Sequence, residues 1–291
     1  THTHTHTRTR SVAVLAGIGA SRKNAKIVYH VHEDLTLSVG NLFRVWAVKA
    51  TADAVVFVAP KCRYAFEPIS HKKVERVIPN AIDPEPFLRA KRDKRIRNDH
   101  GVRGNEVVFL TAAFLSPRKG IDILLRAFQN VAESCSHARL WIAGGTPPEN
   151  ASYADQQKQF VEEHGLSNVV TFLGHREEIP ELMKAADVFV LASRNEALPL
   201  TIAEAMAAEL PVIATDAGSV RSMIADGETG TVVDVEDAEA LAQAMIAYAQ
   251  NPDRRQREGT AGRERALSLY APEAIYQQIE EVIETLTSES E

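Results

Sequence analysis

The sequence predicts an α/β protein with parallel β-sheets, and two observations support that prediction. From residue 106 to 234, short runs of β-branched and apolar residues alternate with amphipathic stretches, as expected for strands buried on both faces and joined by helices. Residues before about position 84 repeat this alternation over a shorter length. We therefore expect two Rossmann-like domains with parallel sheets, the first of them incomplete.

The longer half is predicted to contain six strands, Val107–Leu115, Arg139–Ala143, Val169–Leu173, Val188–Ala192, Pro211–Thr215 and Thr231–Val233. Between the first two, apolar residues from Ile121 to Val131 recur on one helical face. Gly165 and Gly227 are expected to end helices, because glycine readily adopts the left-handed conformation found there.

The tail from Asp237 to Leu286 is predicted to form two or three helices, with breaks at Pro252 and Pro272. The shorter half is predicted to contain strands and one helix, at Lys26–His32, Ala54–Val58, Val74–Ile78 and, for the helix, Gly40–Ala50.

These patterns, with a proline-rich and then basic stretch after position 83, predict the domain limits. They are a first domain over 1–84, a linker over 85–104, a second domain over 105–270 and a C-terminal helix over 271–291. Whether that helix packs back on the first domain is left open.

Composition excludes several classes of protein. The chain has 291 residues, 45% hydrophobic and 25% charged, which is typical of an ordinary folded protein. Its net charge of 33 − 39 = −6 argues against nucleic acid as the main partner. Cys62 and Cys135 are the sole cysteines, too few for a disulfide framework or a cysteine-rich zinc site. The longest apolar runs are about 10 residues, short of the ~20 that span a bilayer.

A basic run lies inside the predicted linker. Six of the nine residues from Arg89 to Arg97 are Lys or Arg. Such a run fits an anionic membrane surface or a polyanion site, but a solvated helix is the more common explanation, and we prefer it.

Two other patterns are weak. The repeated His2, His4 and His6 would share one face of a strand, as a zinc site requires, but no acidic or cysteine ligand is nearby, so a frayed strand is preferred. Gly17 and Gly19 resemble the start of a dinucleotide fingerprint, with Glu33 at a suitable distance. Arg22 occupies the place of its third glycine, so nicotinamide binding is disfavoured.

The stretch from Ser193 to Ala207 carries most information about function, because it follows a buried strand and opens a helix. Ligands bind at such strand ends in open α/β sheets. Pro199 suits the first turn, which leaves the amides from Leu200 onward pointing at an anion. Glu196 and Glu204 can accept hydrogen bonds from sugar or ribose hydroxyls. The alternative is that both acidic residues merely complement the helix dipole.

Several motifs in order resemble those of retaining GT-B glycosyltransferases of the "group 1" class, glycosyltransferase family 4. Glu196 and Glu204 match the E-x7-E signature of that family. Further matches are Ser116-Pro-Arg-Lys119-Gly120, Trp141-Ile-Ala-Gly-Gly145, Phe172-Leu-Gly174-His175, Val77-Ile-Pro-Asn-Ala-Ile-Asp83 and Val28-Tyr-His-Val-His32. The resemblance implies a GT-B fold, with the first domain on the acceptor side and the second binding a nucleotide-sugar.

The resemblance also implies roles for single residues. His32 and Glu196 are the implied catalytic residues, His32 across the cleft from the donor and Glu196 beside the transferred sugar. The implied donor-binding residues are Arg118, Lys119, Gly174, His175, Ala197, Leu198, Leu200, Thr201 and Glu204. Lys119 would pair with the donor's phosphates and Glu204 with its ribose. A structural role for His32 is the alternative. No metal and no cofactor are expected.

Two departures from the family pattern keep alternatives open. The family commonly has Gly-Arg where this chain has Ala113 and Phe114, and Arg118 is the candidate replacement cation. The opening strand and glycine-rich loop of the first domain are not recognisable, so we expect Thr1 to lie inside that domain, or the chain to be half of a split enzyme that needs a partner chain.

The expected activity is transfer of a hexose from a nucleoside-diphosphate sugar with retention of configuration. A non-catalytic nucleotide-sugar-binding half and a nucleotide-sugar 2-epimerase are the alternatives. The base, the sugar and the acceptor, whether glycan, lipid-linked or small molecule, are not named by the sequence. The expected location is the cytoplasm, with peripheral contact at the inner face of the membrane left open.

Overall fold

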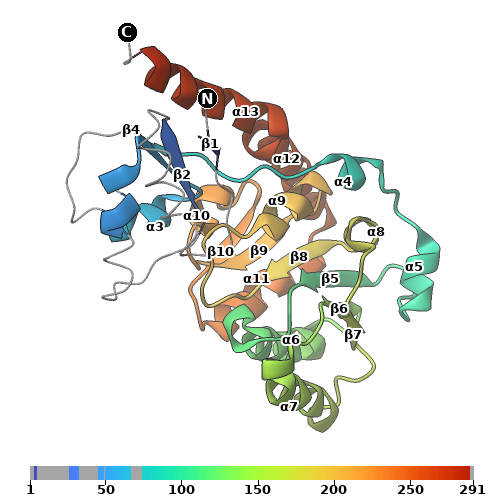
Figure 1. Ribbon diagram of the computed structural model, residues 1–291. Coiled ribbons are helices and arrows are strands. Elements are labelled where there is room, and N and C mark those ends of the chain that lie inside the picture. Colours follow the sequence, from blue (N-terminus) through green and yellow to red (C-terminus); the bar gives the residue numbers. More distant parts are fainter. Residues whose placement is uncertain (1–2, 5–25, 33–44, 49, 67–73, 289–291) are drawn as a thin grey trace. The chain divides into compact units, whose positions relative to one another are not determined.

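The computed structural model describes residues 3–4, 26–32, 45–48, 50–66 and 74–288 (Figure 1). The chain divides into two compact units, Thr1–Ala81 with Pro272–Glu291, and Ile82–Ala271. The glycine pattern with Arg22 and Glu33 lies outside the described residues, as does part of the helix expected over 40–50, whose described residues 45–48 and 50–51 are helical.

The first unit contains a parallel sheet in the order β1-β2-β3-β4, comprising β1 (Thr3–His4), β2 (Ile27–Val31), β3 (Ala54–Phe57) and β4 (Val74–Val77). After β3 come the short helix α3 (Pro60–Arg63) and the 3₁₀ turn η1 (Tyr64–Phe66). Helix α13 (Pro272–Ser288) belongs to the same unit. Its Ile275, Val282 and Leu286 are buried with Ala54, Val56 and Ile78 in one apolar cluster.

The second unit contains a six-stranded parallel sheet in the order β10-β9-β8-β5-β6-β7. Its strands are β5 (Val107–Ala112), β6 (Ala138–Ala143), β7 (Val170–Gly174), β8 (Val188–Leu191), β9 (Val212–Thr215) and β10 (Gly230–Val233). The order reverses between β5 and β8, which is the topological switch point where ligands bind in doubly wound sheets. The α/β class with parallel sheets is confirmed.

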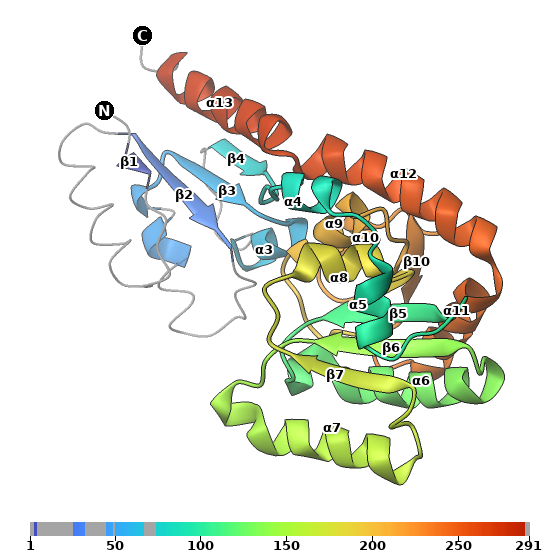
Figure 2. The ribbon, with the colours of Figure 1, turned by 90° about the vertical axis from the view of Figure 1, so that its right-hand side faces the viewer.

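Helices cover both faces of this sheet (Figure 2). They are α4 (Glu85–Arg89), α5 (Lys94–Asp99), α6 (Ile121–Ser134), α7 (Ala151–Glu163), α8 (Ile179–Ala185), α9 (Leu200–Ala207), α10 (Val220–Met223), α11 (Ala238–Gln250) and α12 (Pro252–Tyr270). One apolar cluster joins the sheet to α8, α9 and α12, and a second joins it to α6, α7 and α11. The strands are therefore buried on both sides, which explains their continuous apolar runs.

The expected breaks at Pro252 and Pro272 are confirmed, because α12 and α13 begin at these residues. Gly165 follows α7 with a φ of 67°. The expectation for Gly227 is wrong, since α10 ends at Met223 and Gly227 lies in the turn before β10, where its amide donates to Gly230 O at 2.8 Å. Within the described part of the chain, no helix combines the length and apolar character that crossing a membrane demands.

Candidate functional site

The segments that follow β5 and β8 meet at the switch point of the second sheet. After β5 the chain makes the 3₁₀ turn η2 (Pro117–Lys119), closed by a hydrogen bond from the Lys119 amide to Ser116 O at 3.0 Å. Gly120 follows with a φ of 64°, and a Cβ at this residue would lie 1.9 Å from Ala192 O. A glycine is therefore needed to seat the turn against the end of β8.

Glu196 is the buried centre of an ion-pair cluster at this point. Its Oε1 lies 2.5 Å from Lys119 Nζ, and its Oε2 lies 3.2 Å from Arg118 Nη1. The Ser193 hydroxyl donates to Oε1 at 2.7 Å. Glu196 is only 7% exposed. One carboxylate thus holds both cations of the turn after β5 against the loop after β8.

A second set of contacts, which the sequence analysis did not single out, fixes the same two segments. Arg194 donates to Pro117 O at 2.6 Å and pairs with both carboxylate oxygens of Asp122 at 2.8 Å. Tyr153 donates to Asp122 Oδ1 at 2.7 Å. Burial acts to raise the pKa of Asp122, but the hydrogen bonds from Arg194 and Tyr153 outweigh it and hold that pKa below its usual value. This network keeps Arg118 and Lys119 in place.

Glu204 differs from Glu196 in having a carboxylate that pairs with none of the residues that the structure describes. It is half-buried on α9, and no hydrogen bond or ion pair to its carboxylate is found among the residues that the structure describes. Burial raises its pKa, because the charged form loses solvation without compensation. The Thr201 hydroxyl, one turn earlier, is likewise buried without a partner in the described region. Such groups are costly unless a ligand satisfies them.

The remaining predicted donor-binding residues lie at neighbouring places on the second unit. Ala197 and Leu198 belong to the loop after β8, where Leu198 and Leu200 pack on the apolar core. Gly174, with a φ of 70°, ends β7, and His175 follows it exposed.

Phe114 is 56% exposed just after β5. A Cβ on Gly145 would lie 3.7 Å from His175 Cβ and 4.0 Å from Phe114 Cε1. The Phe114 ring and the His175 side chain thus both lie close to Gly145, beyond the ends of β5, β6 and β7.

His32 lies in the other unit. It follows β2, is exposed, and its ring centroid lies 4.3 Å from that of His30. Because His32 belongs to the first unit, the geometry of the site in the second unit does not include it. Across the described residues, no group of three or more His, Cys, Asp or Glu side chains is arranged to hold a metal ion.

The site thus combines two cations, a buried carboxylate that holds them, and, on the next helix, a carboxylate and a hydroxyl that have no partner among the described residues. Cations and free amides attract phosphate, whereas carboxylates accept from hydroxyls. A molecule carrying both phosphate and vicinal hydroxyl groups satisfies both requirements.

Comparison with known proteins agrees with this chemistry. Residues 92–265, more than half of the chain, match the family described as Glycosyl transferases group 1. The chain belongs to this family. It is 31% identical over 231 residues, 74% of its length, to the GDP-mannose-dependent alpha-(1-6)-phosphatidylinositol monomannoside mannosyltransferase of Mycolicibacterium smegmatis. It is 30% identical over 260 residues, 88% of its length, to the phosphatidyl-myo-inositol mannosyltransferase of Mycobacterium leprae.

This group 1 glycosyltransferase chain spans 58% and 65% of the length of those two relatives. Among solved structures it is similar to Anabaena HepE in complex with UDP and glucose. The TM-score is 0.83 and the identity 25%, over 95% of this chain and 76% of the other. The GT-B likeness thus extends over both units.

Proposed function

We propose that this chain carries the donor site of a retaining glycosyltransferase of family 4, which moves a hexose from a nucleoside-diphosphate sugar to a glycan, lipid-linked or small-molecule acceptor. Family membership supports the transferase class. The observation that carries the donor site is Glu204, a half-buried carboxylate without a partner in the described residues. It lies on α9, the helix that follows the loop carrying Glu196 and its ion pairs with Lys119 and Arg118.

The proposed roles follow from the chemistry of each group. Lys119, Arg118 and the first amides of α9 would face the diphosphate. Glu204 would accept from the two ribose hydroxyls, and Thr201 would complete this contact. Glu196 would keep the cations in position and accept from hydroxyls of the transferred sugar. The exposed ring of Phe114 and the backbone at Gly174 and His175 would border the base.

In the proposed reaction, the bond between the anomeric carbon and the diphosphate breaks while the acceptor oxygen attacks on the same face. The leaving diphosphate takes the acceptor proton, so no dedicated protein nucleophile is required. Lys119 and Arg118 would stabilise the negative charge that develops on the leaving group. His32 would orient the sugar or acceptor from the first unit. We propose that the transfer reaction needs neither metal nor cofactor. We also propose that it occurs in the cytoplasm or at the inner face of the membrane.

The base is the point on which the relatives differ. The Mycolicibacterium smegmatis relative is named as GDP-mannose-dependent, whereas HepE is solved with UDP and with UDP-glucose. Both bases therefore belong in the test.

The test is a thermal-shift series with UDP, GDP, ADP and NAD on the wild-type chain, Glu204→Ala and Glu239→Ala. A ligand at 100 times its Kd stabilises the folded state by about 2.7 kcal/mol. We expect one nucleoside diphosphate to raise the melting temperature of the wild type and of Glu239→Ala, whose glutamate is exposed in the first turn of α11. Glu204→Ala should lose most of that shift.

An unchanged shift in Glu204→Ala would overturn the site assignment, and a shift with NAD alone would overturn the function. Incubation with the matching nucleotide-sugar then separates three activities. Turnover that needs an acceptor supports transfer, and turnover without one supports a 2-epimerase. Binding without turnover, restored by a second chain, supports a split enzyme.

A further inference from the structure

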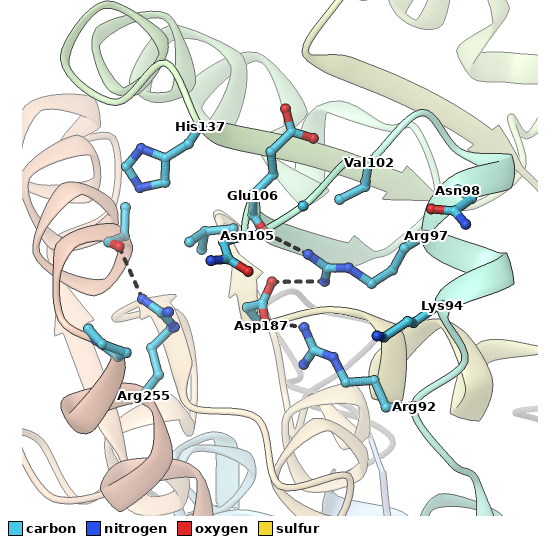
Figure 3. Close-up of a pocket in the computed structure, with 14 residues that line it drawn as sticks. Arg92, Lys94, Arg97, Asn98, Val102, Asn105, Glu106, His137, Asp187 and Arg255 are labelled. Atoms are coloured by element: carbon cyan, nitrogen blue, oxygen red, sulfur yellow. Dashed lines mark hydrogen bonds and ion pairs between the residues drawn. The ribbon is translucent and has the colours of Figure 1, made fainter.

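The second unit has a cavity of about 730 Å³ beside the amino ends of its strands (Figure 3). It is lined by residues just before or at the starts of β5, β6 and β8, including Glu106, His137 and Asp187. Because all six strands are parallel, these starts lie at the edge of the sheet opposite to Lys119 and Glu196. The cavity is therefore separate from the proposed donor site.

Part of the basic run from Arg89 to Arg97 forms one wall, and the start of α12 contributes Arg255 from the other side (Figure 3). Asp187 accepts from Arg92 Nη2 at 2.6 Å and from Arg97 Nη1 at 3.0 Å. Arg97 also donates to Ala185 O at 2.7 Å and to Glu106 O at 2.5 Å. Arg97 is thus a buried residue that ties the linker to the sheet, contrary to the solvated helix expected from its sequence.

That structural role does not account for the other cations of the wall. Lys94 is exposed, and its ammonium has no partner among the described residues. Arg255 uses Nη1 for the carbonyls of Tyr248 and Ala249 at the end of α11. Its Nη2 and Nε donate to no group in the part of the chain that the structure describes.

The charge balance of the cavity is positive. Its lining has four cations, Arg92, Lys94, Arg97 and Arg255, against two carboxylates, Asp187 and Glu106, which leaves 4 − 2 = +2. Asp187 is already shared by two arginines and the Val108 amide. The Glu106 carboxylate pairs with Arg139 and accepts from the Arg103 amide at 2.6 Å, and it points away from Asp187 in Figure 3. Neither carboxylate is hydrogen-bonded to Lys94 or Arg255.

We propose that this cavity is a second binding site, for a phosphate group carried by a small molecule or by a lipid headgroup. A planar guanidinium group can donate two parallel hydrogen bonds to two oxygens of a phosphate, and a lysine adds a mobile positive charge. Figure 3 places Arg255 on the opposite side of the cavity from Arg92 and Lys94, so cations from separate elements border the space that a phosphate would occupy. The volume is in the range of small-molecule sites, roughly 300–1,000 Å³, which leaves room for a group attached to the phosphate.

The test is calorimetric titration of inorganic pyrophosphate into the full chain and three variants. Lys94→Glu reverses the charge of the free ammonium at the first residue of α5, where a carboxylate suits the helix dipole, so folding is preserved. Lys91→Glu is the matched control, an exposed lysine three residues earlier that does not line the cavity. Lys119→Gln removes the donor-site cation.

We expect Lys94→Glu to weaken pyrophosphate binding about tenfold or more, as loss of a charged hydrogen bond implies. Lys91→Glu should leave that binding within about twofold, which is within the scatter of surface-charge effects. Lys119→Gln should weaken only the separate binding of pyrophosphate at the proposed donor site and leave the Lys94-dependent binding unchanged. Loss of binding in Lys119→Gln alone would assign it to the donor site and overturn this proposal without affecting the proposed function. Equal losses of pyrophosphate affinity in Lys94→Glu and Lys91→Glu would attribute the binding to general surface charge. That result would also overturn the proposal.

A second arm identifies the source of the phosphate. Vesicles of phosphatidylglycerol and of phosphatidylcholine are sedimented with the same proteins. Binding to phosphatidylglycerol alone, lost in Lys94→Glu but retained in Lys91→Glu, would assign a headgroup. Pyrophosphate binding without vesicle binding would assign a soluble phosphate compound. Absence of Lys94-dependent binding in both arms would overturn the proposal.

Discussion

The two ends of strand β8 carry the same arrangement of charges. Before the strand, Asp187 is held by Arg92 and Arg97 at 2.6 and 3.0 Å. After it, Glu196 is held by Lys119 and Arg118 at 2.5 and 3.2 Å. Each carboxylate also accepts one neutral hydrogen bond, from the Val108 amide and from the Ser193 hydroxyl. In both places a carboxylate on the chain around β8 fixes a cationic segment that is distant in sequence.

The two ends differ in which charges remain without partners. After the strand, the Glu204 carboxylate, an acceptor, has no partner among the described residues. Before the strand, the Lys94 ammonium and the Nε and Nη2 groups of Arg255, which are donors, have none in that part of the chain either. An acceptor suits hydroxyl groups, and donors suit anions. An ion pair within the protein therefore indicates how a segment is held, while the groups left over indicate what each end can bind.

The largest expected effect tests whether Asp187 is structural. Asp187→Ala leaves the Arg97 guanidinium buried without its counter-ion, and removing one partner of a buried pair costs about 3–5 kcal/mol of unfolding free energy. Urea unfolding would measure the loss. Arg89→Ala breaks the exposed pair with Glu85 in the same segment and should cost less than about 1 kcal/mol. Similar losses in the two variants would contradict the comparison.

Glu196→Gln tests whether the carboxylate at the other end of β8 contributes to catalysis rather than to stability. We expect kcat for transfer to fall about 10²- to 10³-fold, the usual cost of removing one electrostatic group from an active site. Binding of the nucleoside diphosphate should not weaken, because Lys119 and Arg118 are released from their ion pairs. Steady-state kinetics and calorimetry measure the two quantities, with Glu239→Gln as control. A parallel loss of both would make Glu196 a purely structural residue.

The smallest expected effect concerns the unpartnered carboxylate. Burial raises the pKa of Glu204 in the folded chain, so stability is lost as the pH rises through that pKa and the charged form appears. Glu204→Gln should therefore stabilise the unliganded chain at pH 7 by about 1 kcal/mol, the low end for an unsatisfied buried group. Below about pH 4, where the carboxyl is neutral in both states, the gain should vanish. A gain independent of pH would refute the explanation.

The sequence predicts the second sheet well because local patterns determine it. Its strands are mostly apolar or β-branched runs, and Pro252 and Pro272 mark helix starts that need no knowledge of distant residues. Glu196, Glu204 and Lys119 could be found because short motifs contain them. Their ion-pair geometry was not predictable, since Lys119 and Glu196 are 77 residues apart.

Residues that act through long-range contacts were missed for the same reason. Arg194 is next to a motif, yet its partner Asp122 is 72 residues away and shows no distinctive local pattern. Arg97 looks like one cation in a solvated run, and only the fold brings it to Asp187. The neighbouring Ile96 packs on the apolar core, so an apolar residue inside the basic run was a local sign that this helix does not lie wholly in solvent.

The first and last residues of the second unit lie side by side, since the Ile82 amide donates to Tyr270 O at 2.9 Å. A continuous segment whose ends meet can be joined there by a short linker and opened at an exposed loop elsewhere, because circular permutation is tolerated when termini are close. The second unit is thus suited to excision or reordering as a single piece. The first unit, assembled from two separate stretches of chain, would need both stretches supplied together.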